Sequence, residues 1–256
     1  MTKSESVIVV TGAGSGLGRG LSIALAKRGH TIIATDRCND AAQETILKLP
    51  ADALGEAYEL DVTSTTAVEH FAQQMADRNV GVLINNAGLQ HVAPLEDFPQ
   101  EKWDLMLDVM LNGTCRMTRA LLPGMRRAGY GRVINIGSIH SLIASPYKTA
   151  YVAAKHGLLG FSKAVALETA ELDVTINTIC PSYIRTPLVD AQIADQANAQ
   201  GISEDDVIDK IMLEPMPKKV FITVEEIAGT IEFLLSPQAR NITGQSIIID
   251  GGWTAR

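Results

Sequence analysis

The sequence has few cysteines, no basic run and no long apolar stretch, and each shortage excludes a class of protein. The three cysteines, Cys38, Cys115 and Cys180, are too few and too scattered for a disulfide framework. None has metal-ligand spacing to another Cys or to a His, so no metal site is expected. A net charge of −7 repels a phosphate backbone, and nucleic acid is not an expected partner.

No stretch approaches the ~18 uninterrupted apolar residues of a membrane span, so no membrane partner is expected. The segment Met1 to Ser6 is short and polar and lacks the pattern of a signal peptide, which predicts a cytoplasmic protein. With 256 residues, 46% of them hydrophobic and 20% charged, the chain fits one globular domain over residues 1–256.

Short apolar runs alternate with longer amphipathic segments. The runs, which read as buried strands, are 7–10, 31–35, 80–84, 132–136, 174–179 and 246–249, and helices are expected at 17–28, 103–125 and 151–170. Alternation of this kind predicts an α/β fold with a doubly wound, Rossmann-type parallel sheet and helices on both faces. The polar segment 187–219 interrupts the pattern and is interpreted as a helical substrate lid or as a surface insertion.

A glycine-rich turn, Thr11 to Arg19 (TGAGSGLGR), follows the first expected strand and opens a helix. Residues without a Cβ allow backbone N–H groups to approach a pyrophosphate, and the helix N-terminus favours negative charge there. The turn therefore predicts dinucleotide binding.

Asp36 ends the second expected strand, where a carboxylate can bind the adenosine ribose hydroxyls and repel a 2′-phosphate. NAD is therefore favoured over NADP, although the adjacent Arg37 could accept that phosphate. Asp61 and Val62 are interpreted as following a further strand, between the runs 31–35 and 80–84, and either border the adenine or form a capping turn.

Tyr151 and Lys155 lie four residues apart, on one face of an expected helix. Such a pair is either a solvated helix face or an acid/base pair in which the cation lowers the tyrosine pKa. Ser138 ends a strand, where its hydroxyl could donate to a substrate oxygen, and Asn85 to Gly88 end another. Asn112 is expected to be a buried mid-helix amide that serves a structural hydrogen bond or a relay water.

Together these motifs resemble the short-chain dehydrogenase/reductase family, and they occur in the family's order along nearly the whole chain: Thr11-Gly12-x-x-x-Gly16-x-Gly18, Asn85 to Gly88, Asn112, Ser138, Tyr151-x-x-x-Lys155 and Pro181. The resemblance implies four catalytic roles. Tyr151 would exchange the proton, Ser138 polarise the oxygen, Lys155 hold the nicotinamide ribose, and Asn112 position a water. It also implies cofactor contacts from Gly12, Ser15, Gly16, Leu17, Gly18, Asp36, Asp61, Val62, Asn86, Ala87, Gly88, Tyr151, Lys155, Pro181, Ile184 and Thr186.

Gln90, His140 and Lys148 are polar residues expected near the reacting carbon. A lysine charge with neighbouring hydrogen-bonding groups could hold a desolvated carboxylate, whereas the alternative is that His140 and Lys148 are solvated loop residues.

Within the family, segments 88–91, 95–99, 150–157, 185–189 and 251–256 are similar to members that oxidise short 3-hydroxy acids. This similarity implies substrate contacts from Gln90, Ser138, His140, Lys148, Tyr151, Tyr183, Gln192 and Trp253. Tyr183 stands where those members carry Trp, so the wall beside the substrate methyl is expected to be smaller and more polar. The expected reaction is (R)-3-hydroxybutyrate plus NAD giving acetoacetate, NADH and a proton.

A 3-oxoacyl thioester reductase, a polyol dehydrogenase and a catalytically inactive NAD-sensing protein are the alternatives. The expected helices at 103–125 and 151–170 are more apolar than one sheet face requires, which predicts a symmetric homo-oligomer, and the family resemblance implies a homotetramer.

Overall fold

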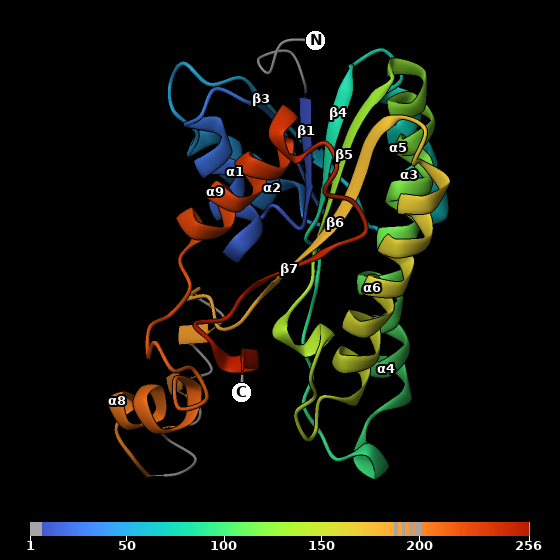
Figure 1. Ribbon diagram of the computed structural model, residues 1–256. Coiled ribbons are helices and arrows are strands. Elements are labelled where there is room, and N and C mark those ends of the chain that lie inside the picture. Colours follow the sequence, from blue (N-terminus) through green and yellow to red (C-terminus); the bar gives the residue numbers. More distant parts are fainter. Residues whose placement is uncertain (1–6, 187–188, 191–192, 195–196, 198–200, 256) are drawn as a thin grey trace.

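The computed structural model describes residues 7–186, 189–190, 193–194, 197 and 201–255. Seven parallel strands form one sheet in the order β3-β2-β1-β4-β5-β6-β7 (Figure 1). The strands are β1 (Val7–Thr11), β2 (Thr31–Asp36), β3 (Gly55–Glu59), β4 (Val80–Asn85), β5 (Tyr130–Ile136), β6 (Asp173–Pro181) and β7 (Ser246–Ile249). The chain order reverses between β1 and β4, and open parallel sheets bind ligands at such a point, beyond the carboxyl ends of the strands.

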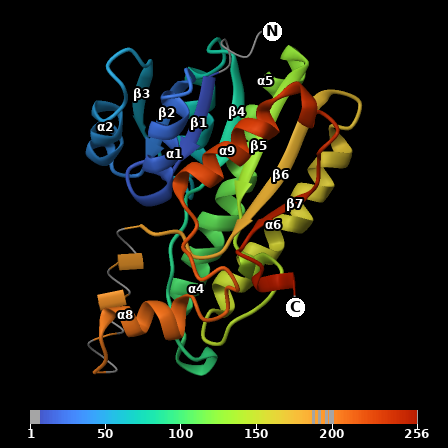
Figure 2. The ribbon, with the colours of Figure 1, turned by 60° about the vertical axis from the view of Figure 1, so that its left-hand side comes forward.

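Helices cover both faces of the sheet (Figures 1 and 2). On one face, α1 (Gly16–Ala26), α2 (Asn39–Leu47) and α9 (Val224–Leu235) bury apolar side chains such as Leu21, Leu25 and Ile231. On the other, α3 (Thr65–Gln74), α5 (Gly113–Ala128) and α6 (Thr149–Glu168) bury a second cluster that includes Phe71 and Met117. The predicted doubly wound α/β fold is confirmed.

Each of the six apolar runs forms a strand, as predicted. The remaining strand, β3, does not coincide with an apolar run in the sequence. It lies at the edge of the sheet, and its two glutamates, Glu56 and Glu59, are exposed. An edge strand is buried on fewer sides than a central one, so its sequence carries a weaker hydrophobic signal.

The single helix expected at 103–125 is interrupted. It consists of α4 (Gln100–Leu107), a π-helical turn η2 (Asp108–Asn112) and then α5. A π-helical turn adds a residue to the helix and so rotates the side chains around it relative to a regular α-helix. Met110 is buried, with 1% of its surface exposed, while Asn112, two residues further along and therefore on the opposite side of the helix, is exposed.

The lid was expected over 187–219. Within it, residues 187–188, 191–192, 195–196 and 198–200 lie outside the described residues. The described part contains α8 (Glu204–Val207) and a π-helical turn η4 (Ile208–Met212), and α8 protrudes from the body of the molecule (Figure 1). Its apolar side chains form a small cluster of their own around Val207 and Met212. Helical structure is thus present there, and closure over a substrate remains a prediction.

Candidate active site

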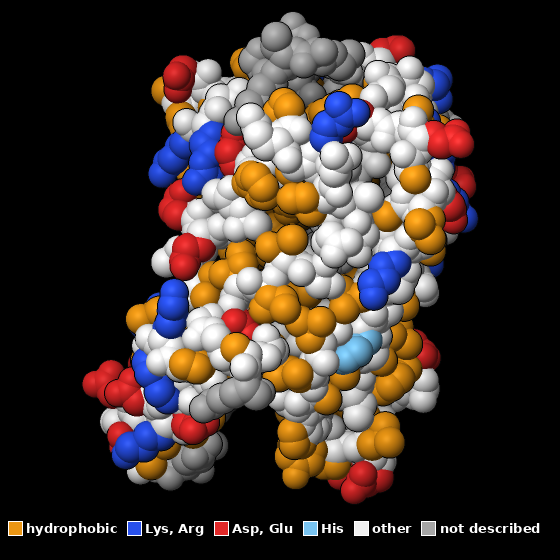
Figure 3. Space-filling view, viewed as in Figure 1, with side chains coloured by type: hydrophobic (Ala, Val, Ile, Leu, Met, Phe, Trp, Pro, Cys, Tyr) orange, Lys and Arg blue, Asp and Glu red, His pale blue; other side chains and the backbone are white. Residues whose placement is uncertain are grey.

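A cavity of about 630 Å³ runs along the carboxyl ends of the central strands. Its walls come from the glycine-rich turn, the ends of β2, β4, β5 and β6, and the start of α6. In the space-filling view, the molecule is hollowed between the segment that carries α8 and the one that carries α4 (Figure 3). The cavity has the size and the concave shape of a cofactor and substrate site.

The glycine-rich turn fits a pyrophosphate because its glycines carry no side chain and its backbone turns tightly. Gly12 and Gly16 both have positive φ values, 63° and 50°, and both line the cavity where β1 leads into α1. Gly18 does not line it. A Cβ there would collide with the Gly12 carbonyl oxygen, so this glycine, expected to touch the cofactor, instead allows α1 to pack against the turn.

The Asp36 carboxylate is fixed in place by backbone donors from two sides. Gly14 N–H donates to Oδ2 at 2.9 Å, and Cys38 N–H donates to Oδ1 at 3.0 Å. Asp36 lines the cavity beside Asp61 and Val62, as does the exposed Arg37. A carboxylate held at the end of β2 can accept hydrogen bonds from ribose hydroxyls, as the sequence predicted.

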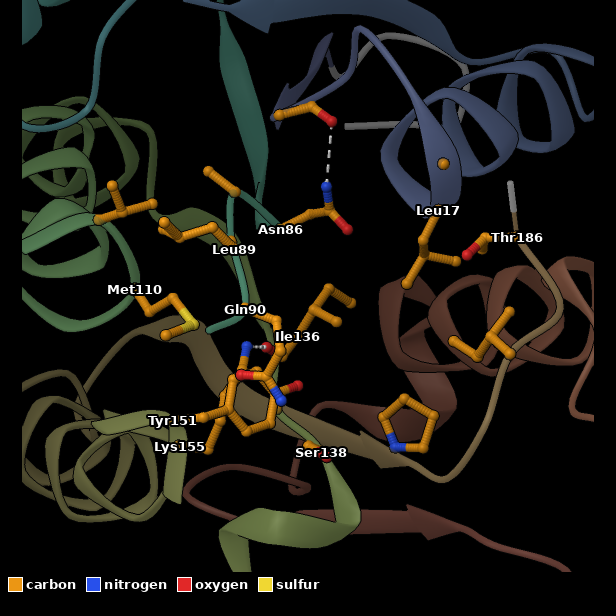
Figure 4. Close-up of a pocket in the computed structure, with 18 of the residues that line it drawn as sticks. Leu17, Asn86, Leu89, Gln90, Met110, Ile136, Ser138, Tyr151, Lys155 and Thr186 are labelled. Carbon is orange, nitrogen blue, oxygen red and sulfur yellow. Dashed lines mark hydrogen bonds between the residues drawn. The ribbon is translucent and has the colours of Figure 1, made fainter. Parts of the chain in front are cut away.

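Asn86 ties the end of β4 to the glycine-rich turn. Its Nδ2 donates to the carbonyl oxygens of Thr11, at 2.9 Å, and Gly12, at 3.2 Å. Its neighbours Ala87 and Gly88 line the cavity, as do Pro181, Ile184 and Thr186 from the segment that ends β6 (Figure 4). The expected cofactor residues therefore converge on one continuous wall, apart from Gly18.

Tyr151, Lys155 and Ser138 meet at the floor of the cavity (Figure 4). Ser138 lies beside the Tyr151 phenol and favours its ionised form. Lys155 is 5% exposed, its Nζ donates to the Ile136 carbonyl oxygen at 2.6 Å, and it lies 5.6 Å from the centre of the Tyr151 ring. Because α6 begins at Thr149, one helical turn brings the phenol and the ammonium to the same face.

The pKa of Tyr151 differs from expectation. Burial raises this pKa above its ordinary value, and the Ser138 hydrogen bond opposes the rise. Lys155 is not among the groups that lower it, and burial in turn lowers the pKa of Lys155 to about 8. For the polypeptide alone, burial therefore outweighs the effect of Ser138 on the pKa of Tyr151, and the lowering of this pKa by Lys155 stays a prediction.

Five of the expected substrate residues surround this floor. Gln90, His140, Lys148, Tyr183 and Trp253 all line the cavity, whereas Gln192 lies outside the described residues. Trp253 packs between two aromatic rings, 6.3 Å from His140 and 6.0 Å from Tyr183. These side chains come from loops far apart in the sequence and meet only in the fold.

The Lys148 ammonium lies 5.9 Å from the Tyr183 ring centre and makes no salt bridge or hydrogen bond with the described part of the chain. Burial lowers its pKa. Nearby, the buried Oε1 of Gln90 has no hydrogen-bond partner among the described residues. Burying a cation or an amide oxygen without a hydrogen-bond partner costs free energy, and a bound ligand could supply the missing partner to both groups.

Asn112 was predicted to be buried at this site, and that prediction is wrong. The residue is exposed, does not line the cavity, and donates from Nδ2 to Asp108 Oδ1 at 3.1 Å. The π-helical turn places Met110 in the wall beside Tyr151 instead (Figure 4). Sequence reasoning missed Met110, although its helical spacing to the buried Met106 and Met117 was a signal that could have found it.

Among the described residues, no cluster of His, Cys, Asp or Glu could hold a metal ion. No helix in the same part of the chain has the length and apolar character needed to cross a membrane.

A family model described as enoyl-(acyl carrier protein) reductase matches residues 12–254. The D-beta-hydroxybutyrate dehydrogenase of Rhizobium meliloti is 43% identical over the full length of both chains, and that of Cupriavidus necator is 40% identical over 97% of each. Among solved structures, a single-residue variant of actinorhodin polyketide ketoreductase with NADPH is 28% identical with a TM-score of 0.92, over 100% of this chain and 99% of that one. The chain belongs to the short-chain dehydrogenase/reductase family of oxidoreductases.

Proposed function

We propose that the protein oxidises a short 3-hydroxy acid, (R)-3-hydroxybutyrate, to acetoacetate with NAD, and catalyses the reverse reduction. The observation that carries the substrate class is Lys148, a partly buried cation without an anionic partner among the described residues, on the cavity that contains Tyr151. The names of the two dehydrogenase relatives support the same substrate.

The residues that would hold the nicotinamide cofactor are Gly12, Ser15, Gly16 and Leu17 for the pyrophosphate, Asp36, Asp61 and Val62 for the adenosine, and Asn86 to Gly88, Tyr151, Lys155, Pro181, Ile184 and Thr186 for the nicotinamide half. A Cβ on Gly12 would meet the Ala87 backbone at 2.8 Å, so the turn and the end of β4 form a cradle that only a residue without a side chain permits. Bound NAD supplies the hydride acceptor. The Asp36 carboxylate favours NAD over NADP, because it would repel a 2′-phosphate.

Tyr151 acts as the acid/base of the proposed reaction. In oxidation its phenolate takes the substrate hydroxyl proton, while Ser138 donates a hydrogen bond to the same oxygen. Since burial raises the pKa of Tyr151, the ionised phenol requires stabilisation, to which the Ser138 hydroxyl contributes and to which the positive charge of an oxidised cofactor would add. The carbonyl oxygen of Ile136 holds Lys155 beside the Tyr151 ring, where the ammonium would contact the nicotinamide ribose.

Lys148 and Gln90 form the proposed carboxylate site. The lysine supplies charge, and the unpartnered Gln90 amide supplies a hydrogen bond. His140 contributes less than the sequence predicted, because both of its ring nitrogens face serine hydroxyls, Ser138 at 3.4 Å and Ser145 at 2.7 Å. Tyr183 and Trp253 form the wall, which limits the length of the substrate.

The test is activity on a panel of substrates. Purified protein should form NADH from (R)-3-hydroxybutyrate faster than from its S enantiomer or from polyols, and should act on acetoacetate faster than on acetoacetyl thioesters. Tyr151→Phe should lower kcat by ~10²-fold or more while the protein still binds NADH, because the change removes the acid/base. Preference for a thioester or a polyol would replace the proposal with the corresponding alternative, and full activity of Tyr151→Phe would overturn the mechanism.

The lid at 187–219, the homotetramer and the cytoplasmic location form part of this proposal as predictions. Exposed apolar side chains on α6 and α9, such as Leu167 and Phe233, support an interface with further copies of the chain.

A further inference from the structure

The wall of the cavity on the α4–α5 side offers no polar route for a proton among the described residues. Met110 occupies it, 1% exposed, in an apolar cluster with Ala150, Ala154 and the Tyr151 ring. Lys155 has one hydrogen-bond acceptor in the described structure, the Ile136 carbonyl oxygen. A proton gained by Tyr151 therefore meets no acceptor side chain on that wall among the described residues.

A series of hydrogen-bonding groups leaves Tyr151 on the opposite side. Ser138 lies beside the Tyr151 phenol and lowers its pKa, and the Ser138 Oγ lies 3.4 Å from His140 Nδ1. His140 Nε2 lies 2.7 Å from Ser145 Oγ. Ser145 is partly exposed and does not line the cavity, so it connects the buried imidazole to the outside of the loop before α6.

Local structure holds this series in place. The short helix η3 (Ile139–Ser141) follows β5, with Ser138 N–H donating to Ser141 Oγ at 3.1 Å and His140 N–H donating to Ser138 Oγ at 3.1 Å. The imidazole packs edge to face with Tyr151, at 6.1 Å between ring centres, and with Trp253. The ring therefore presents one nitrogen to each serine.

We propose that His140 and Ser145 carry the reaction proton between Tyr151 and solvent, an inference that rests on the proposed oxidation. As the substrate O–H bond breaks, the proton bonds to the Tyr151 oxygen, and the phenol proton passes to Ser138 Oγ. The Ser138 proton moves to His140 Nδ1, the Nε2 proton leaves to Ser145 Oγ, and Ser145 releases its own proton to water. One proton leaves the substrate and one reaches solvent, and the reverse order serves reduction.

The charge state of His140 suits a relay. Burial, with smaller effects of the positive charges of Lys148 and His156, lowers its pKa to about 4. The imidazole is therefore neutral near pH 7, and a neutral ring has one donor and one acceptor nitrogen, which is the arrangement needed to pass a proton across it.

Ser145→Ala tests the proposal, because it removes the outer hydroxyl without touching the cavity. We expect kcat for oxidation to fall by about tenfold, less than the ~10²–10⁴ that a whole acid/base group contributes, while KM for hydroxy acid and NAD changes less than about twofold. The solvent deuterium isotope effect on kcat should rise, and proton release to an indicator dye should slow in a stopped-flow experiment.

Ser145→Thr keeps a hydroxyl and should restore kcat, and Asn112→Ala, on the exposed side of the π-helical turn, should match the parent. Parental kcat and isotope effect in Ser145→Ala, or a change in KM alone, would overturn the relay. A parent protein inactive on every secondary alcohol would instead contradict the proposed function.

Discussion

Lys148 gives the sharpest prediction about the substrate. Lys148→Met removes the charge and keeps most of the side-chain volume, so packing against the Tyr183 ring is retained. In the described structure this ammonium has no hydrogen bond or salt bridge, and burial lowers its pKa, so a bound carboxylate would be its first close anion.

The magnitude follows from this environment. A hydrogen bond to a charged group contributes ~1.5–3 kcal/mol, which corresponds to a rise in KM of roughly 10- to 150-fold at ~1.4 kcal/mol per tenfold. The reacting carbon and Tyr151 are untouched, so kcat at saturating substrate should change little. Affinity for NADH, measured by its fluorescence, should be that of the parent.

The assay compares (R)-3-hydroxybutyrate with its methyl ester, which lacks the negative charge. The acid should lose its advantage over the ester in Lys148→Met. Lys48 directly follows α2 and pairs with Glu44, so Lys48→Met should leave activity on both substrates unaffected. An unchanged KM for the acid, or an equal loss for acid and ester, would refute the carboxylate site.

Two further predictions concern the cofactor and pH. Asp36→Ala should lower the ratio of kcat/KM for NAD to that for NADP by at least about tenfold, because the carboxylate that repels a 2′-phosphate is lost; an unchanged ratio would mean that Asp36 does not select the cofactor. The pKa of His140 is about 4 in the folded protein, against an ordinary value of 6.5. Between these two pH values the unfolded chain binds a proton at this residue and the folded protein does not. The free energy of unfolding therefore falls as the pH drops from 6.5 toward 4. Between pH 7 and pH 5 the parent should therefore lose about 2 kcal/mol more of its free energy of unfolding than His140→Gln does, measured by urea titration; equal losses would contradict the shifted pKa. The groups that act on this imidazole, Lys148, His156 and the Tyr151 ring, are present in both proteins.

The sequence by itself determined the features that depend on short-range spacing. Alternating apolar runs determined the parallel sheet, and the glycine-rich turn with Asp36 determined the cofactor wall, because strand ends and turns are local properties. The four-residue spacing of Tyr151 and Lys155 placed them on one helix face, and the structure brings both to the cavity.

Only the tertiary structure decided which side chains complete the site and how their charges behave. Met110 lines the cavity beside Tyr151, whereas Asn112 is exposed, and which face of this helix meets the site depends on how the helix packs against α6. The contact of His140 with Ser145 depends on how one loop folds back, and the raised pKa of Tyr151 depends on burial. Spacing along the chain fixes which residues share a face, whereas packing between distant segments fixes how deep each one lies and therefore its pKa.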